Sequence, residues 1–167
     1  MSKSNRLLDT APILIMLVIV ALAVTSLNVT QVSAAGYPMT INSVETISLS
    51  TGTVAINFTR GDTIFFKVNV SGVGTYAYVG PGYAYVARSF MMIVRVTDPQ
   101  GHMVFFGVVK DSISQYETKS YSVGWWIPSG AMPGQYKVKV MIMDNWPWIV
   151  PSTALAMYYE ATFTVSS

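Results

Sequence analysis

The chain has 167 residues, and 11% of them are charged, against about 25% in an ordinary soluble protein. It contains no cysteine, which excludes disulfides, cysteine-bound iron–sulfur clusters and the blue-copper site that a secreted sandwich of this size could carry. The net charge is +2 and the basic residues are scattered along the chain, which argues against a nucleic-acid partner.

The first 35 residues have the composition of a segment that enters a membrane. Lys3 and Arg6 precede an uncharged apolar stretch, and Val32-Ser-Ala34 then offers the small residues that a signal peptidase accepts. The apolar residues 11–27 match the lower limit of a spanning helix, about 17 residues. A cleaved signal peptide and a retained anchor therefore both stay open. Either one places residues 36–167 outside the cytoplasm, because the basic residues stay inside. The location we predict is the cell membrane, with the domain facing outside the cytoplasm.

Beyond residue 36 the sequence shows the period-two alternation of half-buried strands. The alternation is clearest in residues 62–70, 135–144 and 159–165. It predicts that Ile64, Phe66, Val68, Val70, Tyr136, Val138, Val140 and Ile142 point into the core. Further strands are expected at residues 40–49, 54–59, 90–97, 103–109 and 116–123. The tetrapeptide Asp98-Pro-Gln-Gly101 predicts a type I turn and hence a hairpin.

Strands without intervening helices imply antiparallel pairing, closed as a sandwich or a barrel, and we choose the sandwich. We therefore predict an all-β fold, an immunoglobulin-like antiparallel β-sandwich of seven to eight strands preceded by one N-terminal hydrophobic helix. Two parts are expected: residues 1–35 as signal peptide or membrane anchor, and residues 36–167 as one extracytoplasmic domain.

Two segments interrupt the strand pattern and are rich in aromatic residues. Residues 71–89 contain a predicted projecting hairpin, and residues 145–151 form a loop that its two prolines keep out of a central strand. Tyrosine and tryptophan favour interfaces because they combine a large rigid surface with a polar group. The candidate interface residues are Tyr76, Tyr78, Tyr83, Tyr85, Trp146 and Trp148. Trp125 and Trp126, by contrast, are expected in the core.

The sequence offers little to an enzyme acting alone. His102 is the one histidine; it follows the predicted turn and is expected to be solvated, and no nucleophile motif accompanies it. Metal sites need more histidine, cysteine or clustered carboxylate ligands than the sequence shows, so no metal and no cofactor are expected in this chain. Asn57 and Asn69 begin Asn-x-Ser/Thr tripeptides and are glycosylation candidates, which suits an extracytoplasmic domain.

A resemblance adds a specific function. It is carried by Asp98-Pro-Gln-Gly101, by Val104–Val109, by Tyr121–Pro128 with its Trp-Trp-Ile-Pro ending, and by Met132-Pro-Gly-Gln-Tyr136. With the N-terminal hydrophobic segment and the chain length, these motifs resemble the DoxA-like small subunit of thiosulfate:quinone oxidoreductase. The resemblance covers nearly the whole chain and supplies no catalytic signature, so the catalytic residues are unknown.

The resemblance implies a multi-spanning, DoxD-like membrane partner. The complex would oxidise thiosulfate to tetrathionate outside the cytoplasm and pass the electrons to membrane quinone, the acceptor, while this chain stays free of cofactors. Arg88, Arg95 and Lys110 are the candidate ligands of the thiosulfate oxyanion, since arginine suits bidentate oxyanion recognition. The plainer interpretation of these three residues is solubility of the strand faces.

Two alternatives remain. The chain could be a structural subunit of a pilus, thread or surface layer that self-assembles, with residues 37–49 adding to a neighbour's sheet. It could also be a solute-binding or adhesion domain with its ligand at the tyrosine and tryptophan loops.

Overall fold

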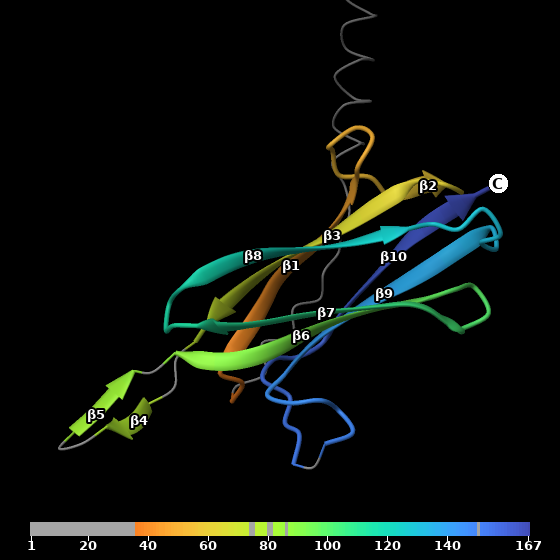
Figure 1. The fold of residues 1–167 in the computed structure, drawn as a ribbon. Helices are drawn as coiled ribbons and strands as arrows, with labels where there is room; N and C mark the ends of the chain where they lie inside the picture. The colour runs from red at the N-terminus through yellow and green to blue at the C-terminus, as the bar shows by residue number, and fades with distance from the viewer. Residues whose placement is uncertain (1–35, 74–75, 80–81, 86, 150) are drawn as a thin grey trace, which may run out of the picture. The chain divides into compact units, whose positions relative to one another are not determined.

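The computed structural model describes residues 36–167 except residues 74–75, 80–81, 86 and 150 (Figure 1). The expected N-terminal helix and the choice between signal peptide and anchor fall on residues 1–35, outside the described residues. None of the described residues lies in a helix that could cross a membrane. They form strands β1 (Met39–Ser48), β2 (Asn57–Thr59), β3 (Thr63–Gly72), β4 (Tyr76–Val79), β5 (Gly82–Tyr85), β6 (Arg88–Thr97), β7 (Met103–Ile113), β8 (Thr118–Trp126), β9 (Gly134–Met143) and β10 (Tyr159–Ser166).

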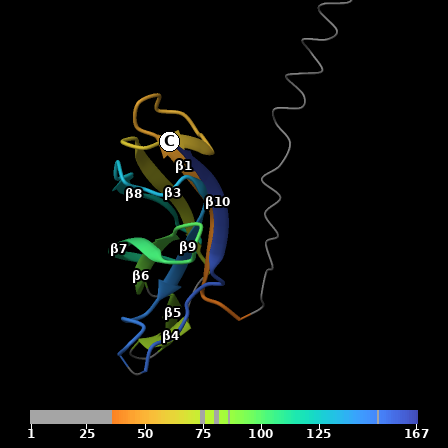
Figure 2. The same cartoon turned by 90° about the vertical axis from the view of Figure 1, so that its right-hand side faces the viewer.

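Eight of these described strands form two sheets, as an all-β sandwich requires. One sheet has three strands in the order β1-β3-β8, and the other has five in the order β2-β10-β9-β6-β7. Strands β4 and β5 form a separate two-stranded hairpin. Figures 1 and 2 show this hairpin at the end of the domain away from the C-terminus.

One core lies between the two sheets. The alternating side chains predicted to point inward do so: Ile64 to Val70 on β3 and Tyr136 to Ile142 on β9 are fully buried at every second position. At its centre is Phe163 of β10. The centroid of its ring lies 5.5 to 6.1 Å from those of four other rings, Phe58, Phe66, Trp125 and Tyr136.

The hairpin predicted at residues 98–101 is confirmed. The Gly101 amide donates to the Asp98 carbonyl at 3.0 Å, and β6 pairs with β7 on either side of this turn. Gly101 has a φ of 87°, a value that glycine adopts without steric cost. The positive φ and the register shift at Val96/Thr97 are typical of a type I turn closed by a glycine bulge.

The prediction that all pairs are antiparallel is wrong for β2, which runs parallel to β10. After β1 the chain reverses direction, and Val54 bridges back to Ile47. It then bends again at Ile56, whose carbonyl accepts from the Thr164 amide at 2.8 Å, and so joins the other sheet. Because the chain reverses twice within a few residues, β2 ends up parallel to its new neighbour.

Strand β1 pairs with β3 inside its own sheet from Met39 to Ser48. Strand β1 is the edge strand of that sheet, so this pairing leaves the predicted addition to a neighbour's sheet untested.

Candidate functional site

The chain's two aromatic loops both leave the domain near the start of β1. The Pro38 carbonyl accepts from the Val73 amide at 2.9 Å, just before the β4–β5 hairpin. The Met39 amide donates to the Leu155 carbonyl at 3.0 Å, just after the tryptophan-containing loop. We call this end the aromatic end; it comprises the β4–β5 hairpin, the β7–β8 turn (residues 114–117) and the Trp loop (residues 145–149). In Figure 1 the hairpin projects to one side and the Trp loop lies apart from it, on the side of the domain away from the C-terminus.

Hydrogen bonds define the backbone of the Trp loop. The Ile149 amide donates to the Trp146 carbonyl at 2.9 Å, which makes residues 146–149 a β-turn with Pro147 at the position that proline favours. At the start of the loop the Asn145 Oδ1 accepts from the Trp146 amide at 2.9 Å. The backbone of this loop is therefore defined at both ends of the turn.

Trp146 holds the loop against the outward face of β7. Its ring stacks on Phe106 with a centroid separation of 6.5 Å, and the Lys110 ammonium lies 5.3 Å from its centroid. Trp148 stacks on Trp146 at 4.8 Å and leaves 69% of its surface exposed. Trp146 is thus an anchor and Trp148 the exposed tip.

The four tyrosines of the hairpin occupy paired positions. The register sets Tyr76 opposite Tyr85 and Tyr78 opposite Tyr83, which confirms the predicted hairpin. Their side chains lie outside the described part of the structure, so their predicted interface role stays a prediction.

Tyr116, in the β7–β8 turn, is a candidate that the sequence did not single out. It is 80% exposed and has a φ of 59°, which is uncommon for a bulky residue. Its amide donates to the Gly72 carbonyl at 2.9 Å, and Glu117 closes the turn by accepting from the Ser114 amide at 2.8 Å. Strained residues of this kind cluster at functional sites. No residue pattern signals a positive φ at tyrosine, because glycine and asparagine are the usual occupants.

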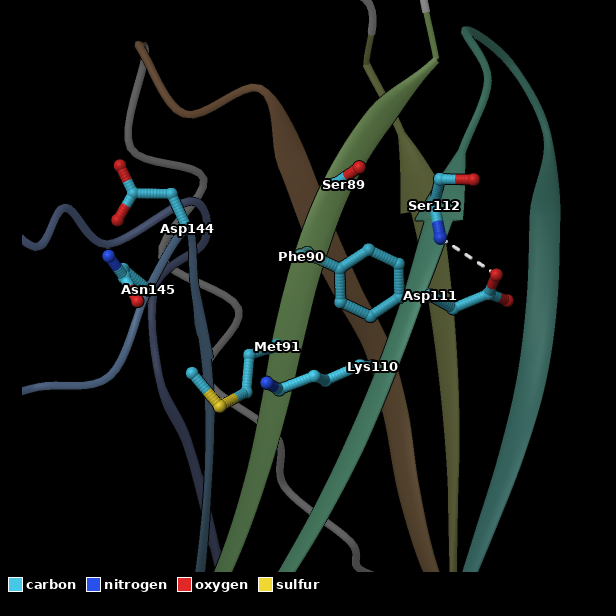
Figure 3. A pocket seen from close by; sticks show the side chains of 8 residues that line it. All are labelled: Ser89, Phe90, Met91, Lys110, Asp111, Ser112, Asp144 and Asn145. Carbon is cyan, nitrogen blue, oxygen red and sulfur yellow. Dashed lines mark hydrogen bonds between the residues drawn. The ribbon is translucent and has the colours of Figure 1, made fainter.

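A shallow pocket opens beside the Trp loop (Figure 3). It has a volume of about 420 Å³. It is lined by Ser89, Phe90, Met91, Lys110, Asp111, Ser112, Asp144 and Asn145. Its charged groups are one ammonium and two carboxylates, an arrangement that does not favour a dianion.

The pKa of Asp111 is lowered, first by the hydrogen bond from the Ser112 amide at 2.7 Å, which Figure 3 shows, and then by the Tyr121 hydroxyl at 2.8 Å. Desolvation and the bond to Asp111 raise the pKa of Tyr121 in turn. Lys119 reaches the same carboxylate at 3.3 Å. These contacts between β7 and β8 join the two sheets, which makes Asp111 a structural group.

The structure does not bring the three candidate oxyanion ligands together. Arg88 shares the inward side of β6 with Phe90, while Arg95 lies on the outward side, because the two positions differ by an odd number. Seven residues of strand separate them by roughly 23 Å. Lys110, opposite Met91 on β7, is the one that lines the pocket.

Trp125 is buried as predicted, but the same prediction for Trp126 is wrong. Trp126 is 57% exposed, and its indole donates to the Gly61 carbonyl at 3.1 Å. Two successive residues of a strand point to opposite faces, so only one of the pair can enter the core. His102 is solvated as expected, with its Nδ1 3.3 Å from the Asp98 carboxylate.

The two glycosylation candidates differ in their surroundings. Asn57 is exposed at the start of β2. Asn69 is half-buried on β3, where its Nδ2 donates to the Ser43 hydroxyl at 2.8 Å and its Oδ1 accepts from Ser120. Within the described part of the chain, no three histidine, cysteine or acidic side chains gather as metal ligands.

Taken together, the two packed sheets and the loops at one end define a β-sandwich domain with an exposed aromatic end. No protein-family model matches this chain, and no curated protein matches its sequence.

Solved structures do resemble the chain. The C-terminal domain of Wzt superposes with a TM-score of 0.57 at 12% identity, over 78% of this chain and 75% of that one. A putative β-galactosidase from Bacteroides fragilis gives 0.52 at 11% identity, over 78% of this chain and 18% of the enzyme. The alkylpurine DNA glycosylase AlkC of Pseudomonas fluorescens gives 0.50 at 12%, over 79% of this chain and 31% of that chain. The chain thus spans less than a third of both enzymes. At these identities the likeness shows a shared sandwich fold and nothing of function.

Proposed function

We propose that this chain is a membrane-tethered, cofactor-free extracytoplasmic subunit whose immunoglobulin-like sandwich turns its aromatic end toward a membrane complex. One observation carries the proposal: the described chain begins at the end that holds the aromatic loops, where Pro38 bonds Val73 and Met39 bonds Leu155. The predicted anchor in residues 1–35 is continuous in sequence with the strand that starts at this end. The interface residues and the tether then act on the same side of the molecule.

The resemblance to the DoxA-like family specifies the complex as a thiosulfate:quinone oxidoreductase. Its multi-spanning, DoxD-like subunit holds the quinone chemistry, and this chain supplies a docking domain with no redox group of its own. Two thiosulfate ions join through a sulfur–sulfur bond to form tetrathionate, and the two electrons released reduce the quinone to quinol with uptake of two protons. Because Arg88 and Arg95 lie on opposite sides of β6, the site proposed for thiosulfate is at the partner or at the interface with it.

Within the aromatic end, the β4–β5 hairpin is the proposed contact with the multi-spanning subunit. The hairpin stands apart from both sheets, and the register pairs Tyr78 with Tyr83 near its tip. Tyrosine is favoured at interfaces because it combines a large rigid ring with a polar group.

Co-purification in mild detergent tests this function. The full chain with both Tyr78→Ser and Tyr83→Ser should lose the multi-spanning subunit and thiosulfate-dependent quinone reduction together. Trp126→Ser is the matched control, because this exposed aromatic residue lies on β8, far along the strand from the aromatic end. Wild-type protein that carries no membrane partner and assembles into fibres would instead support the structural-subunit alternative.

A further inference from the structure

The tip of the Trp loop has no role in the contact proposed for the hairpin. Trp148 leaves 69% and Ile149 leaves 42% of its surface exposed, although both are large apolar residues. The turn that presents them is fixed by the Ile149–Trp146 hydrogen bond at 2.9 Å and by Pro147. The molecule therefore holds an apolar tip in a defined position at its surface.

The tip is held in place by contacts beneath it, unlike an exposed apolar side chain on a surface with no such support. Trp146, beneath Trp148, contacts both Phe106 and Lys110, which lie on the same outward face of β7. Trp148 stacks on that fixed ring at 4.8 Å, which directs it away from the sheet. Two stacked indoles supported from below form a rigid wedge.

The chain outside the described residues indicates what covers the wedge. The uncharged segment 11–27 ends nine positions before Gly36, so the connection can reach at most about 32 Å. The described chain begins beside Leu155, six residues after Ile149. If the segment sits in a bilayer, the Trp loop is therefore within reach of that bilayer's surface.

The chemistry of the tip fits the headgroup layer. Tryptophan is enriched at membrane–water interfaces, where its apolar rings enter the acyl boundary and its N–H stays hydrated. Around the tip, Lys110 is balanced by Asp144 and Asp111, which line the same pocket. Because the charges around the tip balance, we expect binding of the tip to a bilayer without an excess of anionic lipid.

We propose that Trp148 and Ile149 insert into the lipid headgroup layer and fix the tilt of the domain on the membrane. This inference rests on the proposed tether, and it assigns the Trp loop to lipid while the β4–β5 hairpin meets the multi-spanning subunit. The domain then has two contacts with its surroundings at one end, and lipid sets the orientation in which the hairpin is offered.

Quenching of tryptophan fluorescence by brominated lipid tests this directly. All four tryptophans lie after residue 124, so the N-terminal segment contributes no signal. The full chain is reconstituted into phosphatidylcholine vesicles with or without bromine on the acyl chains near the headgroups. Brominated lipid should quench the wild-type protein; Trp148→Phe should remove at least half of that quenching, and Trp126→Phe should leave it unchanged.

Three results overturn the inference, and they are distinguishable. If the protein floats with the vesicles but its quenching is the same in wild type and Trp148→Phe, or is absent, the tip does not touch lipid, and the tether stands. If the protein fails to float with the vesicles, the tether fails, and the lipid contact fails with it. Protection of Trp148 from quenching only when the multi-spanning subunit is present would assign the tip to that protein instead.

Discussion

The close approach of β3 to the β7–β8 turn makes Gly72 a sensitive position. A Cβ atom at Gly72 would lie 2.3 Å from the Ser114 carbonyl oxygen and 3.2 Å from its carbonyl carbon. Both are backbone atoms, and the Gly72 carbonyl also accepts from the Tyr116 amide, so neither side can give way alone. Gly72→Ala should therefore push the turn away by about 1 Å and cost roughly 1–3 kcal/mol, the usual range for overpacking.

Thermal unfolding of the full chain in mild detergent, followed by tryptophan fluorescence, measures this cost. At about 3 °C per kcal/mol, Gly72→Ala should lower Tm by roughly 3–9 °C. Gly130→Ala is the matched control: a Cβ at Gly130 meets nothing within 4 Å, and neither glycine has a positive φ. The control should be neutral or stabilising by up to about 1 kcal/mol. Equal Tm values for the two variants would refute the reasoning.

Three further predictions concern the core and the charged contacts. Phe163→Ala should lower the free energy of unfolding by about 3–5 kcal/mol in urea titrations, since the ring touches four others; a loss below about 1 kcal/mol would contradict this. The pKa of Asp111 is held below its ordinary 3.8, chiefly by the Ser112 amide, so its carboxylate stabilises the fold above that pH and the benefit is lost as the pH falls through the lowered pKa. The Tm gap between wild type and Asp111→Asn should therefore be open at pH 7 and close below pH 3.8. Finally, Lys110→Met and Trp146→Leu should couple by about 0.5–1 kcal/mol in a double-mutant cycle, and additive effects would argue against the cation–π contact.

Much of the strand structure could be predicted because alternation reports burial directly. On β3 and β9 every second residue is apolar, and those residues are the buried ones. The turn at residues 98–101 was predictable for a different reason, since proline and glycine restrict or free the backbone at defined positions. Both patterns are local. They can be recognised without knowing which strands become neighbours in the sheet.

What the sequence did not show depends on contacts distant along the chain. The assignment of β2 to the five-stranded sheet follows from a second reversal at Ile56 and a hydrogen bond to Thr164, more than a hundred residues later. The exposure of Trp126 follows from which of two adjacent tryptophans meets Phe105 and Tyr136 in the core, and Trp125 is the one that does. Neither alternation nor composition distinguishes these outcomes in advance.

The candidate site was predicted in part for the same reason. The two aromatic segments were recognisable from composition, but the departure of both from the domain near the start of β1 depends on the sheet topology. The three basic residues illustrate the opposite case. They lie close in sequence to proposed loops and turns, and yet strand alternation places Arg88 and Arg95 on opposite faces of β6. Proximity along a strand is a poor guide to a shared site unless the positions differ by an even number.

The exposed surface of Trp148 is the physical argument for a partner at the aromatic end, because its burial would be favourable. A tryptophan side chain has up to about 250 Å² of surface, so an exposed fraction of 69% leaves about 170 Å² in water. At 25 cal/mol per Å², burial of that area would contribute roughly 4 kcal/mol. Burial of Trp148 does not stabilise the folded domain, because Trp146 occupies the place against Phe106 and Lys110 that Trp148 would need. The proposed lipid contact would bury part of this area without any change in the fold, which is why a rigid tip suits an interfacial role.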